Sequence, residues 1–197
     1  MRARHNHRAT LLTAALLFLL PAASHAQDRA RVQLESGASD FLRFQLRSVK
    51  AGFIGTSVDG HVRDFEVSYE PVGDGAREVR VTFPVRAMTT SDGGRDAKMW
   101  SYCLDAEHHP RIEIEIPGRL GATFSGEVPA RMRVRGSWRP IRVQLTARRA
   151  GASTVVEGRA RVSLAQLGIP DPSIWIARVE DDVTITFRAH VARQVQS

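Results

Sequence analysis

The sequence predicts an all-β fold, either a closed antiparallel barrel or a sandwich, and three observations lead to this prediction. Apolar residues occupy every second position in short segments, as Ile112, Ile114 and Ile116 do. Clusters of Gly and polar residues, such as 72–75 and 91–94, separate these segments as turns do. Many such segments follow one another. A period of two gives each strand one apolar face and one polar face.

The predicted strands are the segments in which this alternation is clearest. They lie near residues 41–48, 53–58, 61–70, 78–87, 111–117, 122–134, 139–148, 153–164 and 182–193. The segment 122–134 is also compatible with two short strands joined at Glu127-Val128.

One stretch departs from the alternation and predicts a helix. In residues 96–109 the apolar positions lie three and four apart, which is typical of a helix with one buried face. Asp96 is its expected N-cap, and Pro110 is expected to end it. A helix between two groups of strands would plug one end of a barrel. The loop 166–177 is too apolar for solvent and is expected to pack as a lid or end-cap.

Residues 1–26 have the features of a cleavable signal peptide. A basic start precedes the apolar run Leu11–Leu20, which is too short to span a bilayer, and small residues precede the expected cleavage after Ala26. Residues 27–197 would then form one exported domain, with a bacterial periplasm as the natural compartment.

The composition restricts the classes of partner. The formal charge is +7, nearly all the cations are Arg, and aromatic residues do not interleave with them as in a nucleic-acid platform. The arginines could serve an anionic lipid or phosphate surface, or could simply occupy the solvent faces of strands. Cys103 is the one cysteine, so no disulfide can form within the chain.

No motif predicts an enzyme, a metal site or a cofactor. Cys103, His108 and His109 are close in sequence, but their spacing does not put them on one helix face, and no metal-binding motif includes them. The acidic run 180–182 is expected to be solvated. Nucleophile elbows, phosphate loops and dinucleotide fingerprints are absent from the sequence.

The inward apolar faces are the remaining candidate site. A closed sheet of about eight strands can hold one small ligand. Filled and hollow barrels show the same alternation, so the alternation does not distinguish a solid core from a hollow interior. The candidate lining residues are Phe44, Leu46, Phe65, Val67, Val81, Phe83, Met99, Trp100, Ile112, Ile114, Met132, Val134, Val143, Leu145, Ile185 and Phe187.

The order of several short motifs resembles the YceI-like family of bacterial periplasmic lipid-binding proteins. Residues 60–65 resemble its early turn into a long strand, and residues 96–112 resemble its central helix and the strand after it. Residues 136–141 resemble its Gly-x-x-basic-Pro-aliphatic hairpin, and 167–170 resemble its last loop. The resemblance covers nearly all of the expected mature chain.

This resemblance implies a lipocalin-like antiparallel barrel of eight strands with a long apolar tunnel for a polyisoprenoid or similar amphiphile. The protein would then be an exported, soluble, non-enzymatic lipid-binding protein that transports, stores or sequesters its ligand. An Arg at the open end would pair with a phosphate head group. Transient membrane contact and a homodimer are left open, and no nucleic acid is expected.

Two further functions compete with lipid binding. The same barrel could be a ligand-free interaction module that assists a membrane redox or stress-response system. It could also be a small hydrolase or isomerase, which would need an inward acid–base pair drawn from Asp96, Asp105 and His109.

Overall fold

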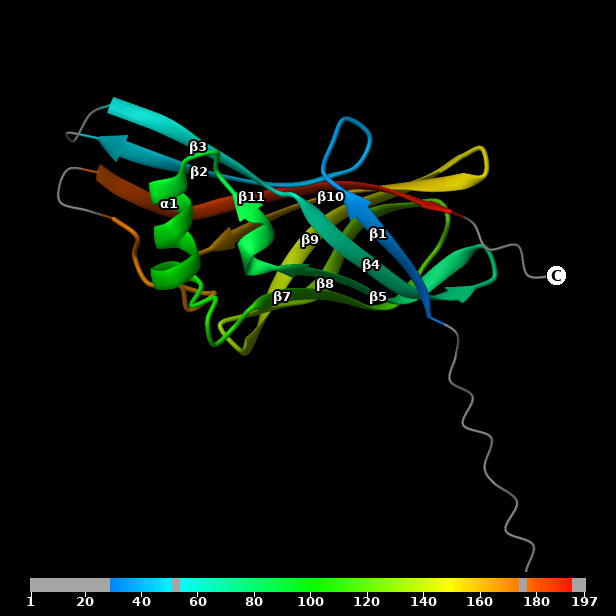
Figure 1. Ribbon diagram of the computed structural model, residues 1–197. Coiled ribbons are helices and arrows are strands. Elements are labelled where there is room, and N and C mark those ends of the chain that lie inside the picture. Colours follow the sequence, from blue (N-terminus) through cyan, green and yellow to red (C-terminus); the bar gives the residue numbers. More distant parts are fainter. Residues whose placement is uncertain (1–28, 51–53, 174–176, 193–197) are drawn as a thin grey trace, which may run out of the picture.

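The computed structural model describes residues 29–50, 54–173 and 177–192. The chain in these ranges is almost entirely β-strand, with one α-helical turn that continues into a π-helix (Figure 1). The elements are β1 (Ala30–Glu35), β2 (Phe41–Lys50), β3 (Ile54–Val62), β4 (Asp64–Val72), β5 (Gly75–Pro84), the 3₁₀ turn η1 (Val85–Ala87), β6 (Met88–Thr89), α1 (Gly93–Lys98), the π-helix η2 (Met99–Cys103), β7 (Arg111–Leu120), β8 (Phe124–Val134), β9 (Ser137–Ala150), β10 (Ser153–Ser163) and β11 (Ala177–Ala192).

All the strands belong to one curled antiparallel sheet. Its order is β1-β4-β5-β7-β8-β9-β10-β11-β2-β3-β6. β3 and β4 are separated only by Arg63, yet β3 pairs with β2 whereas β4 pairs with β5. The chain therefore crosses at Arg63 from one side of the strand order to the other, which curls the sheet around an interior.

The all-β prediction is confirmed. In the described residues the sheet has eleven strands, whereas the alternation predicted nine segments and the family resemblance implied eight strands. The long segment expected near 61–70 belongs to two strands, because its hydrogen-bonding partners change at Arg63. The short strands β1 and β6 are the two that the nine predicted segments lack. They pair with β4 and β3 at the two ends of the strand order, outside the segments with clear alternation.

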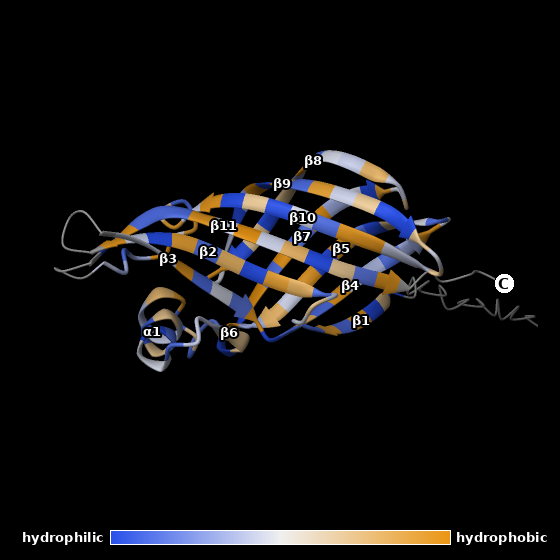
Figure 2. Ribbon diagram, turned by 90° about the horizontal axis from the view of Figure 1, so that it is seen from above, coloured by the Kyte–Doolittle hydropathy of each residue, from blue (hydrophilic) through white to orange (hydrophobic). Residues whose placement is uncertain are grey.

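The alternation of the sequence sorts side chains between the interior and solvent. In β8, Val128, Ala130, Met132 and Val134 are buried while the residues between them are exposed. Figure 2 shows the same alternation of hydrophobic and hydrophilic residues along the neighbouring strands. Each large apolar side chain that is fully buried in this way contributes roughly 1.5–3 kcal/mol to folding.

The N-cap of the helix lies four residues earlier than predicted. Asp92 is its N-cap and accepts a hydrogen bond of 2.9 Å from the backbone nitrogen of Arg95. Asp96, the expected cap, is instead buried. It accepts from the hydroxyls of Thr89 and Thr90, both at 2.6 Å, and from the backbone nitrogen of Thr90 at 2.7 Å. The prediction was wrong because these partners lie outside the helix, where the periodicity of the helix does not reveal them.

The helical segment ends at Cys103, so the prediction that it runs to His109 and is ended by Pro110 was wrong. It covers one end of the curled sheet (Figure 1). Trp100 fixes it to β6 through a 2.9 Å hydrogen bond from Nε1 to the Met88 carbonyl. Arg135 donates to the carbonyls of Tyr102 and Cys103, the last two residues of η2. These contacts make the helix the end-cap that the sequence predicted.

The segment after β10 folds over the same end. Backbone hydrogen bonds form a turn at 163–169, and Lys98 of α1 donates from Nζ to the carbonyl of Pro172. Residues 174–176 of the expected lid and the predicted signal peptide lie outside the described residues. Within the described ranges, no helix has the length and apolar character needed to cross a membrane.

Candidate ligand-binding chambers

The larger hollow in the interior lies beneath the helix and is called the helix-end chamber. It has a volume of about 550 Å³, within the range of small-molecule sites in proteins. The inner sheet face, the helix and the segment 164–172 line it. Its apolar lining includes Phe44, Leu46, Met88, Met99, Leu104, Ile112, Met132, Val134, Val162, Leu164, Leu167, Ile169, Val179, Val183 and Ile185.

Of the polar residues that line the helix-end chamber, Ser48 is buried and others reach solvent. Ser57 and Arg95 are exposed, and Lys98 is half-buried. The guanidinium of Arg95 lies 3.5 Å from the carboxylate of Asp92, whereas the Lys98 ammonium donates to the Pro172 carbonyl at 2.6 Å. Two cations beside an apolar cavity favour a ligand with an anionic or strongly polar head and an apolar tail.

Cys103 also lines the helix-end chamber. Burial raises the pKa of its thiol, and this effect outweighs the opposing influence of Lys98 and Arg135. The thiol is therefore protonated at neutral pH and behaves as a small apolar side chain, which argues against a catalytic nucleophile.

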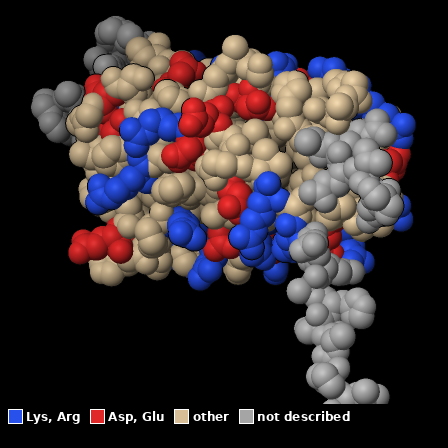
Figure 3. All heavy atoms as spheres, turned by 45° about the vertical axis from the view of Figure 1, so that its right-hand side comes forward, with Lys and Arg blue, Asp and Glu red and all other residues tan. Residues whose placement is uncertain are grey.

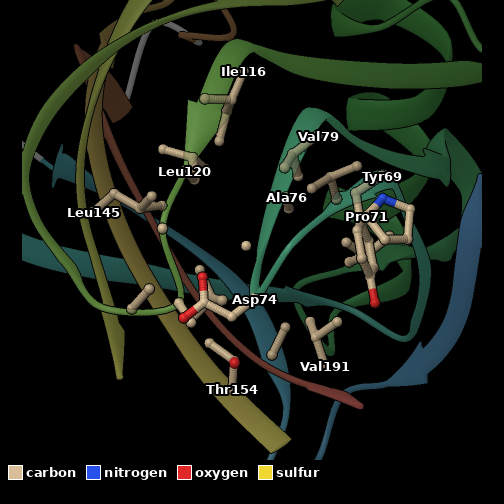
Figure 4. Close-up of a pocket in the computed structure, with 18 of the residues that line it drawn as sticks. Tyr69, Pro71, Asp74, Ala76, Val79, Ile116, Leu120, Leu145, Thr154 and Val191 are labelled. Atoms are coloured by element: carbon tan, nitrogen blue, oxygen red, sulfur yellow. The ribbon is translucent and has the colours of Figure 1, made fainter. Parts of the chain in front are cut away.

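A second hollow lies at the other end of the sheet, beside the turn between β4 and β5, and is called the hairpin-end chamber. Its volume is about 290 Å³. Figure 4 shows that its labelled side chains come from several strands and present mostly carbon, with oxygen atoms on Tyr69, Asp74 and Thr154. Burial raises the pKa of Tyr69, so its phenol is neutral. The Asp74 carboxylate forms an ion pair with Arg149.

The middle of the interior is narrow. A void of only about 30 Å³ remains there, lined by Leu42, Phe65, Ile114, Val143, Phe187 and their neighbours. The interior is thus hollow at both ends and nearly filled between them. The middle void shares Val67, Val81, Ile116 and Phe187 with the hairpin-end chamber and Ile185 with the helix-end chamber, so the three spaces adjoin one another along the interior.

The structure distributes the predicted lining residues over these three spaces. The helix-end chamber is lined by Phe44, Leu46, Met99, Ile112, Met132, Val134 and Ile185. Val67, Val81, Leu145 and Phe187 line the hairpin-end chamber. Phe65, Ile114 and Val143 surround the narrow middle. Phe83 and Trp100 line none of them: Phe83 is buried in the core, and Trp100 packs against the core with its Nε1 bonded to Met88.

Several lining residues escaped the sequence prediction. Leu167, Ile169 and Pro172 belong to the apolar loop that was predicted as a lid, and that loop was the available signal for them. In the hairpin-end chamber, the residues missed are Tyr69, Pro71, Leu120 and Val191. They lie near strand ends, where few alternating residues remain to reveal the pattern.

The remaining candidate groups for metal binding or catalysis lie outside the chambers. Nδ1 of His108 is 2.8 Å from the Asp105 carboxylate, and this hydrogen bond raises the pKa of the imidazole. Nε2 of His109 is 3.9 Å from the same carboxylate. Asp96 is held by Thr89 and Thr90. Among the described residues no group of three or more His, Cys, Asp or Glu could hold a metal ion.

The acidic run 180–182 is tied into the fold. Asp181 accepts from the hydroxyl of Ser163 and, at 2.9 Å, from the backbone nitrogen of Ala165. Glu180 lies 3.8 Å from Arg47. The Asp181 contacts join β11 to the turn after β10, and the Glu180 contact joins β11 to β2, so both residues have structural roles.

The arginines of the sheet occupy its solvent face. The best-paired example is Glu115, which accepts from Arg131 Nε at 2.6 Å and forms an ion pair with Arg80. Burial opposes ionisation of Glu115, but these two arginines outweigh it and lower its pKa. On the face in Figure 3, cationic and acidic side chains lie intermixed, which supports the solvent-face explanation of the basic composition.

A curled antiparallel sheet that encloses apolar chambers belongs to the class of small β proteins whose interior can receive an apolar ligand. Comparison with protein families narrows this class. The model described as the YceI-like domain matches residues 25–191, and the chain belongs to this family.

Solved structures share the fold at low sequence identity. BcnA from Burkholderia cenocepacia has 15% identity and a TM-score of 0.58, over 75% of this chain and 94% of that one. A polyisoprenoid binding domain from Saccharophagus degradans, implicated in plant cell wall breakdown, has 14% identity and a TM-score of 0.60, over 79% and 94%. The YceI protein of Campylobacter jejuni has 10% identity and a TM-score of 0.54, over 71% and 87%. No curated protein gives a significant match.

Proposed function

We propose that this protein binds a polyisoprenoid or a similar long-chain amphiphile, with the apolar tail in the helix-end chamber. The observation that carries the proposal is the helix-end chamber itself. It has a volume of about 550 Å³, and its mostly apolar lining includes the cations Arg95 and Lys98. The binding activity of the Saccharophagus degradans domain supports the ligand class. Binding requires no chemistry, and the protein is proposed to act without catalysis.

The free energy of binding comes from removing the tail from water. Each buried methylene contributes roughly 0.8 kcal/mol. A benzene molecule fits an engineered apolar cavity of about 150 Å³, so on this scale a chamber of about 550 Å³ takes about twenty carbons. A tail of that length supplies ample driving force, and the lining Met99 and Met132 can adapt to its shape.

The head group is proposed to lie between Arg95 and Lys98. Both are on α1, and both line the chamber. A phosphate there would accept from the guanidinium and from the ammonium, and charge-assisted hydrogen bonds of this kind are about twice as strong as neutral ones. The features of residues 1–26 support the proposal that the protein is exported to a periplasm. In that compartment such a carrier would meet membrane lipids. Transport, storage and sequestration all use the same binding step.

The test is calorimetric titration with geranylgeranyl phosphate, a twenty-carbon isoprenoid. Val162 points into the helix-end chamber, whereas its neighbour Arg161 is exposed on the same strand. Val162→Phe is expected to weaken binding at least tenfold, and the matched Arg161→Phe is expected to leave it within twofold. Thermal melts of both variants check that the fold survives.

A protein that fails to bind geranylgeranyl phosphate, and that yields no lipid on solvent extraction after purification from its export compartment, would contradict the proposal. A stable protein partner recovered from membranes together with an empty interior would instead favour the interaction-module function. Equal loss of binding in both variants at position 161 and position 162 would place the ligand outside the chamber.

A further inference from the structure

On the outer face of the sheet, arginines on neighbouring strands can be neutralised by a carboxylate that stands between them. In one row across the strands, the ladder register places Glu115 of β7 between Arg80 of β5 and Arg131 of β8. Glu115 forms an ion pair with each of these arginines. This row therefore carries its own counter-ion.

A second row has the same form but lacks the carboxylate. It lies on β2, β11 and β10, which are neighbours in the sheet (Figure 2). Its register places Thr186 between Arg43 and Arg159, and two residues away on the same face Thr184 pairs with Arg161. The three arginines are exposed, and within the described ranges none of them forms an ion pair. These five residues are called the arginine–threonine patch, and hydroxyls stand there in place of a counter-ion.

The carboxylates around the arginine–threonine patch do not neutralise it. Glu157 forms an ion pair of 2.6 Å with Arg188, and Asp59 accepts a hydrogen bond of 2.6 Å from Gln45. The carboxylate of Asp182 borders the patch on β11, but it is a single negative charge beside three arginines. The patch therefore keeps a net positive charge that the fold does not balance.

An external anion can take the position that Glu115 takes in the first row. Phosphate oxygens accept charge-assisted hydrogen bonds from guanidinium groups. The guanidinium of Arg43 is already oriented, because it stacks over the ring of Phe41 at 4.3 Å from the centroid. From strand geometry, Arg159 lies roughly 7 Å from Arg161 and about 10 Å from Arg43 at the backbone. An array of phosphates can therefore engage all three arginines at once, and a single phosphate cannot.

The surroundings of the patch favour a lipid surface as the source of these phosphates. None of the five residues lines a chamber of the described structure, so the patch is an open face and not a pocket for a free anion. A protein interface is centred on exposed apolar or aromatic anchors. In the part of the chain that the structure describes, the exposed large apolar side chain is that of Tyr102 on η2, outside the patch. A bilayer of anionic lipids presents many phosphates and requires no such anchor.

We propose that the arginine–threonine patch is a docking surface for a membrane that contains anionic phospholipids. This goes beyond the proposed function, which concerns the inner face of the same strands, where Leu46, Val162 and Ile185 line the helix-end chamber. Docking holds the protein at the surface from which an amphiphile is taken up. Each Arg beside an anionic bilayer strengthens binding roughly fivefold, so the three act together.

The experiment is co-sedimentation of the full chain with vesicles of phosphatidylglycerol and phosphatidylcholine in equal parts, or of phosphatidylcholine alone. Binding is expected only to the anionic vesicles at about 0.1 M salt, and it should be lost at about 1 M salt, where the Debye length falls from about 10 Å to about 3 Å. Thr186→Glu supplies the missing internal carboxylate and is expected to weaken vesicle binding at least twentyfold. Thr123→Glu is the matched control, because Thr123 is exposed and outside the patch, and it should stay within threefold.

A second pair of variants serves if Thr186→Glu does not fold in a thermal melt. The double variant Arg159→Gln/Arg161→Gln is expected to weaken vesicle binding at least tenfold. Arg131→Gln/Arg133→Gln removes the same formal charge from arginines that are paired with Glu115 and Glu113, and it should stay within threefold.

Four results would overturn the docking surface. They are equal losses in a patch variant and its control, equal binding to both kinds of vesicle, no binding to anionic vesicles at low salt, and binding of polyglutamate but not of vesicles. Calorimetric titration with geranylgeranyl phosphate separates this proposal from the proposed function. Thr186→Glu should leave that affinity within twofold, since the patch lies on the outer face. Failure of the wild-type protein to bind geranylgeranyl phosphate would count against the proposed function and not against docking.

Discussion

The ammonium of Lys98 donates a hydrogen bond of 2.6 Å to the carbonyl oxygen of Pro172. This contact joins α1 to the segment after β10, and both residues line the helix-end chamber. It therefore couples the cover of the chamber to a cation that is placed to meet a ligand head group. In the proposed complex the same side chain would also meet the head group, which makes Lys98 an informative position for substitution.

Lys98→Met is expected to weaken the binding of geranylgeranyl phosphate about tenfold, while geranylgeraniol, which lacks the charge, loses no more than twofold. A hydrogen bond to a charged group contributes about 1.5–3 kcal/mol. The expected loss lies at the lower end of this range, because the Lys98 ammonium also donates to the Pro172 carbonyl. Calorimetric titration measures both affinities. Lys98→Arg is the matched control and should retain the preference for the phosphate. Equal losses for phosphate and alcohol would show that Lys98 does not contact the head group.

Asp96 makes stability dependent on pH. Burial opposes its ionisation, but hydrogen bonds from Thr89 and Thr90 outweigh burial and lower its pKa from the ordinary 3.8. A lowered carboxyl pKa stabilises the folded state fully above pH 3.8, and this stabilisation is lost as the pH falls below that value. Asp96→Asn is expected to cost about 1–3 kcal/mol at pH 7 and progressively less at lower pH.

Urea unfolding at pH 7 and at pH 3 measures this difference. Asp182→Asn is the matched control, because Asp182 is an exposed carboxylate, and it should change stability by no more than about 0.5 kcal/mol. A cost of Asp96→Asn that stays the same at both pH values would refute the role assigned to the ionised carboxylate.

Gly60→Ala is expected to narrow the helix-end chamber. A Cβ at Gly60 would lie 2.2 Å from Cζ of Phe44, so the ring must move. Binding of geranylgeranyl phosphate should fall at least tenfold, and overpacking should cost about 1–3 kcal/mol of stability. Gly37→Ala is the control, since nothing lies within 4 Å of the position that its added methyl group would take. Unchanged phosphate binding in a folded Gly60→Ala protein would place the tail elsewhere.

The thiol of Cys103 can report the occupancy of the helix-end chamber. It is the one cysteine of the chain, it lines the chamber, and burial raises its pKa. Because the thiolate is the reactive form, alkylation by a small reagent should be slow in the free protein. Geranylgeranyl phosphate is expected to slow it a further tenfold or more. An unchanged alkylation rate in the presence of saturating geranylgeranyl phosphate would place the tail outside the helix-end chamber.

Sequence alternation predicted the inner face of the sheet well. Met132 and Val134 were assigned to the interior from their spacing alone, and both are buried and line a chamber. The prediction failed where partners come from elsewhere in the chain. Asp96 looked like a helix cap, but Thr89 and Thr90 draw it into the fold, and Asp92 takes the cap position.

The side-chain period of two by itself determined which residues face inward, because a strand must turn alternate side chains to opposite faces. It could not determine how much space those residues leave. That was decided by register, which sets Phe44 opposite Gly60 and Phe187 opposite Gly158. It was decided also by the helix and the loop that close one end. Volume depends on which large side chain meets which small one across neighbouring strands, and only the tertiary structure makes those pairs.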